Sequence, residues 1–353
     1  MLAADFELDR RDFAVRAAVS VAPGERLALF GPSGAGKTTL LEIIAGLVRP
    51  RSGKVVLGGR VLTSTVPPVA AVPPWQRRVG LLRQDPGLFP HLTAGGNLRY
   101  AIAPDAASAQ VAELAAALGI GGLLTVMPAR LSGGQAHRVA LGRLLAAPCD
   151  ALLLDEPYAG LDASLRRSLT DLVIGLTAQR QVPSILVTHE LADAQAFGHR
   201  LMVLDQGQLL QDAGPGEVVL APASRRVAEL VGYLGFIPVR RGDAGAGTGV
   251  GTVAGPGDPA RIVAGIHPER VTAGAHPDRG VVLTGTVTGG RPAGAGWETD
   301  LDVAGTVITC RLPARPGSGE LAVTALDPPC FGPDGSALPP GKRPAGWPVQ
   351  VRA

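Results

Sequence analysis

The pattern of hydrophobic and polar positions divides the chain into an α/β part, up to about residue 235, and a β-rich part beyond about residue 261. In the first part, short continuous apolar runs predict buried parallel strands, because strands covered on both faces do not alternate. These runs occupy residues 27–30, 79–82, 151–154 and 185–187. Residues 201–210 have the pattern of a hairpin with a turn at 205–207.

Amphipathic segments separate the apolar runs and predict helices. They cover residues 38–47, 111–118 and 135–146. Strands that alternate with helices indicate an α/β fold with a mostly parallel sheet. We also expect a helical insertion at about residues 90–148.

The β-rich part begins after a segment, residues 240–259, that is dominated by Gly, Ala, Asp and Pro. Strand-like pieces separated by glycines follow and predict a small, all-β, OB-like barrel. They cover residues 261–266, 281–287, 297–303 and 306–312. We therefore expect four parts: an α/β domain at 1–235, a linker at 236–260, a barrel at 261–335 and a Pro/Gly-rich tail at 336–353.

Composition narrows the class of protein further. The 353 residues allow two or three domains, and the net charge of +3 gives no argument for a nucleic-acid partner. The three cysteines, Cys149, Cys310 and Cys330, are too far apart for a disulfide framework or a zinc ribbon, which fits a reducing compartment. No apolar run approaches about 18 residues, and the start lacks a signal-peptide pattern. We therefore expect a soluble chain on the cytoplasmic side.

A glycine-rich loop between a predicted strand and a predicted helix carries the strongest chemical signal. Residues 31–38, GPSGAGKT, match the phosphate-loop pattern G-x-x-x-x-G-K-[ST]. Its backbone N–H groups and the following helix N-terminus suit phosphate. Lys37, one of only three lysines in the chain, would meet the β- and γ-phosphates, and the Thr38 hydroxyl would meet Mg²⁺.

Two carboxylates end the predicted strand at 151–154. Ligands of open α/β sheets lie at the carboxyl ends of the strands. Asp155 is therefore a candidate for holding Mg²⁺, directly or through water, and Glu156 is a candidate base for the proton of an attacking water.

Three further segments are ambiguous by themselves. Ser132, Gly133, Gly134 and Gln135 precede a helix and could form a second anion site or merely a helix cap. Gln84 and His189 follow predicted strands; alone, they would be a solvated loop glutamine and a structural histidine.

In chain order, these elements resemble the ATP-binding subunit of ABC transporters over residues 1 to about 235: the phosphate loop, glutamine loop, LSGGQ signature, Asp-Glu strand, D-loop (159–162) and switch histidine. The resemblance implies a head-to-tail homodimer in which Ser132 and Gly134 of one subunit meet the γ-phosphate held by the other. It also implies an aromatic residue that stacks on adenine, for which Phe13 is the candidate and Phe6 the alternative. Gly142, inside the helix after the signature, has no functional explanation from the sequence.

The resemblance implies an α/β P-loop NTPase fold of the ABC type, with the helical insertion as a helical subdomain, and a site that binds ATP and Mg²⁺. The catalytic residues are Glu156, His189 and Gln84, and the metal is held by Thr38, Gln84 and Asp155. The nucleotide-binding residues are Gly31, Ser33, Gly34, Ala35, Gly36, Lys37, Thr38, Thr39, Ser132, Gly133, Gly134, Gln135 and Asp162.

Several segments suggest a narrower subfamily. Residues 77–80, 84–85, 88–91 and 96–100 resemble the ATPase of molybdate importers, residues 266–271 resemble the entry into a TOBE domain, and residues 284–289, 297–303 and 306–309 resemble a Mop-type barrel. The resemblance implies uptake of molybdate or tungstate, with an importer of ferric iron, sulfate, a polyamine or a sugar as the alternative.

Such a subunit would work on the cytoplasmic face of the membrane with integral membrane permease subunits and, indirectly, an extracytoplasmic solute-binding protein. Three other functions remain open. They are a small-molecule P-loop kinase, an ABC ATPase acting on DNA or ribosomes, and a barrel whose main role is oxyanion binding.

Overall fold

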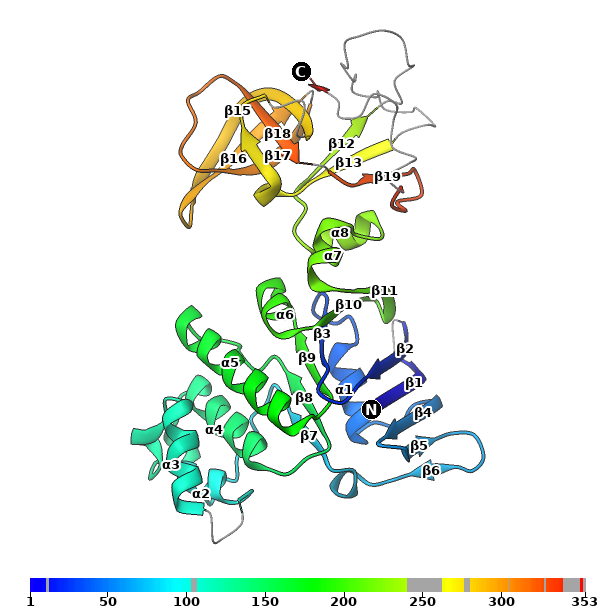
Figure 1. Cartoon of the computed structure of the whole chain (residues 1–353), viewed down its shortest axis with the longest axis vertical. Coiled ribbons are helices and arrows are strands. Elements are labelled where there is room, and N and C mark those ends of the chain that lie inside the picture. The colour runs from blue at the N-terminus through cyan, green and yellow to red at the C-terminus, as the bar shows by residue number, and fades with distance from the viewer. Residues whose placement is uncertain are drawn as a thin grey trace. The chain divides into compact units, whose positions relative to one another are not determined.

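The computed structural model describes residues 1–10, 13–102, 107–239, 262–275, 280–303, 305–326, 328–338 and 350–351. The chain forms two compact units, Met1–Pro215 and Gly216–Ala353 (Figure 1). No helix of the described ranges is both long and apolar enough to cross a membrane.

The centre of the first unit is a mostly parallel sheet in the order β11-β10-β3-β9-β8-β7. All neighbouring pairs are parallel except the hairpin of β10 and β11. Each predicted strand of the α/β part is confirmed. The bounds are β3 Arg26–Phe30, β7 Val79–Leu82, β8 Ala151–Asp155, β9 Ser184–Thr188, β10 Arg200–Asp205 and β11 Gln208–Ala213.

A second, antiparallel sheet in the order β2-β1-β4-β5-β6 was not predicted. Its strands do carry a signal, since β2 alternates strictly between buried and exposed positions from Val15 to Val21. A search for continuous apolar runs does not detect that alternation. The bounds are β1 Leu2–Asp9, β2 Ala14–Val21, β4 Ser52–Leu57, β5 Arg60–Ser64 and β6 Ala70–Ala71.

Helices cover the parallel sheet, and the core therefore has two halves. Along β8, Leu153 belongs to the apolar cluster shared with α1 and the antiparallel sheet, whereas Leu152 and Leu154 belong to the cluster shared with the other helices. The helices are α1 Lys37–Ala45, α2 Ala94–Arg99, α3 Ala107–Ala117, α4 Gly133–Ala146, α5 Ala163–Arg180 and α6 Leu191–Phe197. Three short 3₁₀ turns are η1 Pro74–Gln76, η2 Gly121–Leu123 and η3 Pro128–Arg130.

Packing explains the glycine inside α4. A Cβ placed on Gly142 would lie 2.5 Å from a methyl group of Leu118 and 2.6 Å from one of Leu98. Both leucines are fully buried. Glycine weakens a helix by about 1 kcal/mol relative to alanine, but here it permits the close approach of these two side chains.

The second unit begins earlier than the predicted boundary near residue 235. Two helices, α7 Pro215–Leu220 and α8 Arg225–Leu230, precede β12 Gly235–Val239. The Tyr233 hydroxyl donates to the Val219 carbonyl at 2.8 Å, and the Arg225 guanidinium lies 4.6 Å from the Phe236 ring centre. The segment 236–239, predicted as the start of a linker, is therefore strand; the rest of that predicted linker, 240–260, lies outside the described residues.

The β-rich region of the second unit contains two sheets. One has the order β12-β13-β19, and the other has the order β14-β18-β15-β16-β17 with β20 also paired to β15. Glu298, Asp300 and Asp302 are partly exposed, while Thr299, Leu301 and Val303 between them are buried. The three acids thus share the outer face of β16. The bounds are β13 Ile262–Ile266, η4 Pro268–Arg270, β14 Val271–Ala273, β15 Gly280–Ala293, β16 Gly296–Val303, β17 Thr306–Leu312, β18 Glu320–Leu326, β19 Cys330–Phe331 and β20 Gln350–Val351.

A buried arginine joins α1 to the antiparallel sheet. Arg77 is 4% exposed and donates to the Ile44 carbonyl at 2.9 Å, the Val72 carbonyl at 2.8 Å and the Thr63 hydroxyl at 2.8 Å. Burial lowers the pKa of Arg77. No carboxylate of the described residues pairs with it, so backbone carbonyls, including that of Ile44 at the negative end of α1, balance its charge.

We expect Arg77→Met to lower the free energy of unfolding of the first unit by about 3 kcal/mol, because it leaves several buried acceptors without donors. Urea denaturation of the full chain measures this loss. Arg78→Met is the matched control, since the Arg78 side chain is 60% exposed in its pair with Asp150. Equal midpoints for both variants would contradict the structural role of Arg77.

Candidate functional site

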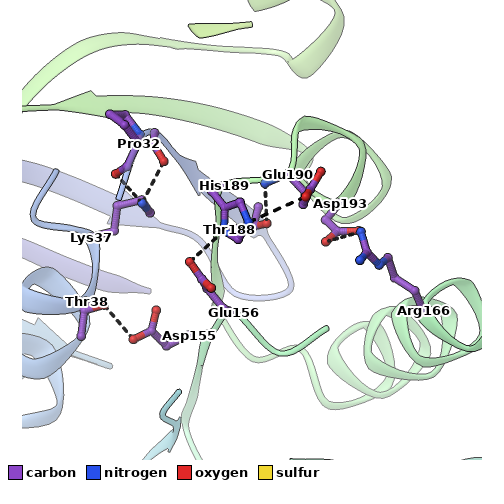
Figure 2. A network of polar contacts seen from close by, with 11 residues as sticks. Pro32, Lys37, Thr38, Asp155, Glu156, Arg166, Thr188, His189, Glu190 and Asp193 are labelled. Carbon is purple, nitrogen blue, oxygen red and sulfur yellow. Dashed lines mark hydrogen bonds and ion pairs between the residues drawn. The ribbon is translucent and has the colours of Figure 1, made fainter. Parts of the chain in front are cut away.

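Four neighbouring strands of the parallel sheet end at one edge and bring distant residues together. In the order β3-β9-β8-β7, Phe30 pairs with Thr188, Asp155 with Val187, and Leu82 with Leu154. The phosphate loop, His189 and Glu156 follow these strand ends directly, and Gln84 lies two residues beyond the end of β7. The sheet therefore places a possible phosphate cradle beside two carboxylates and an imidazole (Figure 2).

The loop after β3 is shaped by a close backbone approach. A Cβ on Gly31 would lie 2.0 Å from the Leu204 carbonyl oxygen on β10, so only glycine fits there. The loop leads into α1, whose first residue is Lys37. Backbone N–H groups and a helix N-terminus thus converge where the sequence predicts phosphate.

The Lys37 ammonium is held inside this loop. It is 5% exposed, and Nζ donates to the Gly31 and Pro32 carbonyls at 2.8 Å each (Figure 2). Burial lowers the pKa of Lys37, while the nearby charges of Glu156 and Asp155 oppose that shift. The ammonium therefore lies close to both carboxylates. Its N–H groups, which donate to loop carbonyls here, could donate to phosphate oxygens instead.

A hydroxyl and a carboxylate meet at the start of α1. The Thr38 hydroxyl donates to Asp155 Oδ2 at 2.8 Å, and Asp155 is 3% exposed. Burial raises the pKa of Asp155, and the Thr38 hydrogen bond opposes the shift. Two adjacent oxygen ligands fit Mg²⁺, which binds few protein groups and takes its other ligands from phosphate and water. No group of three or more His, Cys, Asp or Glu in the described ranges could hold a metal ion.

Glu156 is held in an uncommon conformation next to His189. Its φ is 49°, and its backbone N–H donates to the Val187 carbonyl on β9 at 3.0 Å. Its Oε1 lies 2.9 Å from His189 Nδ1. A pocket of about 120 Å³ borders both side chains, and at about 30 Å³ per water it has room for a few water molecules.

Not every predicted site residue lies in this cluster. Gln84 is exposed beyond β7. Thr39 is buried, and its hydroxyl accepts a hydrogen bond from Arg10. Asp162 caps α5 by accepting from the backbone N–H groups of Ser164 and Leu165.

The signature segment forms the N-terminus of α4. Ser132 and Gln135 make a reciprocal capping box: the Ser132 hydroxyl accepts from the Gln135 N–H at 3.3 Å, and Gln135 Oε1 accepts from the Ser132 N–H at 2.8 Å. The segment therefore does form a helix cap, one of the two alternatives that the sequence left open. It leaves the N–H groups of Gly133 and Gly134, which belong to the first helical turn and have no intrahelical acceptor, for another ligand.

The two aromatic candidates differ in position. Phe6 is 3% exposed in the core and cannot offer a ring face. Phe13 is partly exposed, and a Cβ on Gly36 would lie 3.7 Å from its ring. Phe13 therefore lies beside the phosphate loop.

A pair that the sequence analysis missed lies behind this cluster. Arg166 of α5 and Asp193 of α6 form an ion pair at 3.5 Å (Figure 2), and both line the pocket that borders Glu156 and His189. No motif or periodicity relates two residues on separate helices, so the sequence offered no signal.

Comparison with known proteins places this geometry in a family. A family model described as ABC transporter matches residues 16–159. Two curated relatives come from Mesorhizobium japonicum. A ferric-ion import ATP-binding protein is 39% identical over 251 residues, covering 70% of this chain and 69% of the relative. A molybdenum import ATP-binding protein is 41% identical over 223 residues, covering 61% of this chain and 60% of the relative.

A solved structure has the same fold. It is described as a dimeric post-hydrolysis state of an ATP-binding cassette bound to ADP and phosphate, and it matches with a TM-score of 0.53 at 24% identity, covering 61% of this chain and 99% of that chain. Together with the curated relatives, the fold and the motif order lead to one conclusion: the chain belongs to the ATP-binding proteins of ABC importers, a family of ATPases whose cofactors are ATP and Mg²⁺.

Proposed function

We propose that this chain is the ATP-hydrolysing subunit of an importer for molybdate or tungstate, and that Lys37, Asp155, Glu156 and His189 carry the hydrolysis. The observation that supports the hydrolytic role best is the 2.9 Å contact between Glu156 and His189 at the ends of neighbouring strands. Lys37 lies near the same carboxylate.

Glu156 is the proposed general base. Its carboxylate accepts the proton of the attacking water, and His189 holds that carboxylate in place. The Lys37 ammonium exchanges its two loop carbonyls for β- and γ-phosphate oxygens, and Phe13 offers its ring face to adenine. Thr38 and Asp155 hold Mg²⁺, which neutralises phosphate charge when bound.

The second half of each site comes from a partner subunit in this proposal. In a head-to-tail homodimer, the free N–H groups of Gly133 and Gly134 and the hydroxyl of Ser132 would meet the γ-phosphate held by the other chain. Asp162, at the start of α5, belongs to the same contact. The capping box supports this role, because it fixes the helix end while leaving those two donors available.

The proposed contact with a membrane permease is a groove of about 480 Å³ beside Gln84. Phe89, Tyr100 and Arg143 line it; the two aromatic ring centres are 4.5 Å apart, and the Arg143 guanidinium lies 4.8 Å from the centre of the Phe89 ring. Tyr100 is 68% exposed. Gln84 could then report occupation of the γ-phosphate position to this groove. The chain would lie on the cytoplasmic face of the membrane.

Two features support molybdate or tungstate as the solute. Residues 77–100 contain the segments that resemble molybdate importers, and the segments that resemble a Mop-type barrel lie within strands β15, β16 and β17. Ferric iron is the second candidate, because the ferric-ion relative matches over the larger share of the chain.

Glu156→Gln should bind ATP like the parent and hydrolyse it about 10²–10⁴-fold more slowly, because glutamine retains the shape but is not a base. Steady-state ATPase assays and sizing with ATP measure this. The variant should accumulate as an ATP-bound dimer. Glu113→Gln, on the exposed face of α3, is the control and should retain the parent rate. Normal turnover by Glu156→Gln would remove the proposed base.

Lys37→Ala should lose about 100-fold in ATP affinity, since a charged donor to phosphate is removed, whereas Lys54→Ala, on an exposed position of β4, should not.

Ser132→Arg should bind ATP but not hydrolyse it. An equimolar mixture of Lys37→Ala and Ser132→Arg should recover about a quarter of the parent ATPase rate, because half of the randomly formed dimers contain one intact composite site. No recovery would contradict the head-to-tail dimer.

The solute is tested by reconstituting the chain in vesicles with its co-purifying permease and solute-binding protein. ATP hydrolysis should rise when molybdate or tungstate is supplied, and sulfate and ferric iron should have no effect. Stimulation by ferric iron alone would replace the proposed solute.

Tyr100→Glu should abolish the stimulation of ATP hydrolysis by molybdate or tungstate without changing basal hydrolysis, whereas Trp75→Glu, another exposed aromatic position outside the groove, should preserve it.

A further inference from the structure

An ion pair between two helices lies behind the candidate catalytic residues. Arg166 Nη1 is 3.5 Å from both carboxylate oxygens of Asp193 (Figure 2). The Asp193 side chain is 9% exposed, the lowest exposure of any acid in the ion pairs recorded for the described residues. A buried carboxylate needs a partner, so this pair is structurally constrained in a way that surface pairs are not.

Removing the arginine would therefore have a defined consequence. Burial raises the pKa of Asp193, and the Arg166 charge opposes that shift. Without Arg166, the carboxylate would either take up a proton or move toward water. Either change would alter the first turn of α6, in which Asp193 lies.

The pair joins the beginnings of two helices that carry proposed site residues. Arg166 lies one turn after Asp162, and its N–H donates to the Asp162 carbonyl at 2.9 Å. Asp193 lies four residues after His189, at the start of α6. The backbone between His189 and Asp193 is short. A hydrogen bond from the Glu190 N–H to the Thr188 hydroxyl, at 3.0 Å, holds its beginning.

The same small pocket borders the pair and the catalytic candidates. Arg166, Asp193, Glu156 and His189 all line the pocket of about 120 Å³. A displacement at the Arg166–Asp193 end would therefore change the wall formed by His189.

We propose that Arg166 and Asp193 form a positioning pair for ATP hydrolysis, which fixes the start of α6 against the start of α5 and so holds His189 beside Glu156. This inference rests on the proposed roles of Glu156 and His189. The pair does not touch the reacting atoms; it acts through His189.

Arg166→Met and Asp193→Ala should each lower kcat by about 10-fold or more, because small misplacements of a catalytic group have large effects on rate. The KM for ATP should change by less than about two-fold, because the phosphate loop lies elsewhere. Asp193→Glu should recover most of the parent rate, since its longer carboxylate can still reach Arg166. ATPase kinetics of the full chain measure all three. Values of kcat near the parent's for both Arg166→Met and Asp193→Ala would overturn the proposal.

A second set of variants separates positioning from general damage to the fold. When Arg166→Met is added to His189→Ala, kcat should fall no further, because the residue through which the pair acts is gone. An additional 10-fold loss would overturn the proposal. Arg167→Met, the exposed neighbour on α5, is the matched control and should retain the parent kcat.

The outcomes also distinguish a failure of the proposed function from a failure of the positioning role alone. A parent chain that hydrolyses no ATP would overturn the proposed function, and this inference with it. An active parent that loses activity in Glu156→Gln but not in the pair variants would overturn the positioning role alone. If Arg166→Met fails to fold, Asp193→Asn and Asp193→Glu decide, with loss expected only for the amide.

Discussion

The parallel register of β3, β9, β8 and β7 is the constraint on which the rest of the first unit depends. Parallel strands have all their carboxyl ends at the same edge, so each following loop begins at the same level. Glu156 and His189, which lie far apart in the sequence, come into contact in this way. The helices on both faces are needed because such a sheet has no face that water can cover.

Charge balance explains why so dense a group of ionic side chains can be buried there. Lys37 and Asp155 are both nearly inaccessible to solvent. Burial lowers the pKa of Lys37 and raises the pKa of Asp155, and both shifts favour the neutral form. Loop carbonyls and the Thr38 hydroxyl supply the missing hydrogen bonds. These side chains are therefore already held in place by the chain itself, so the proposed exchange of their partners for phosphate oxygens needs little rearrangement.

Local signals could predict much of this, but contacts between distant segments could not. The continuous apolar runs of β8 and β9 indicate strands buried on both faces, and the glycine spacing before Lys37 indicates a phosphate loop, because each pattern lies within one short segment. The antiparallel sheet was missed although β2 alternates clearly. The role of Gly142 depends on Leu98 and Leu118, and Arg166 finds Asp193 on another helix. These contacts depend on how helices pack, and no periodicity along the chain encodes that.

Glu156 occupies a region of backbone space that side chains rarely adopt, with a φ of 49°. A non-glycine residue there carries strain on the order of 1 kcal/mol or more, which the rest of the fold must offset. Selection for stability alone would therefore favour glycine at position 156 and discard the carboxylate. If Glu156 is the proposed base, the change to glycine that relieves this strain also removes the base, so stability and hydrolysis place opposite demands on position 156.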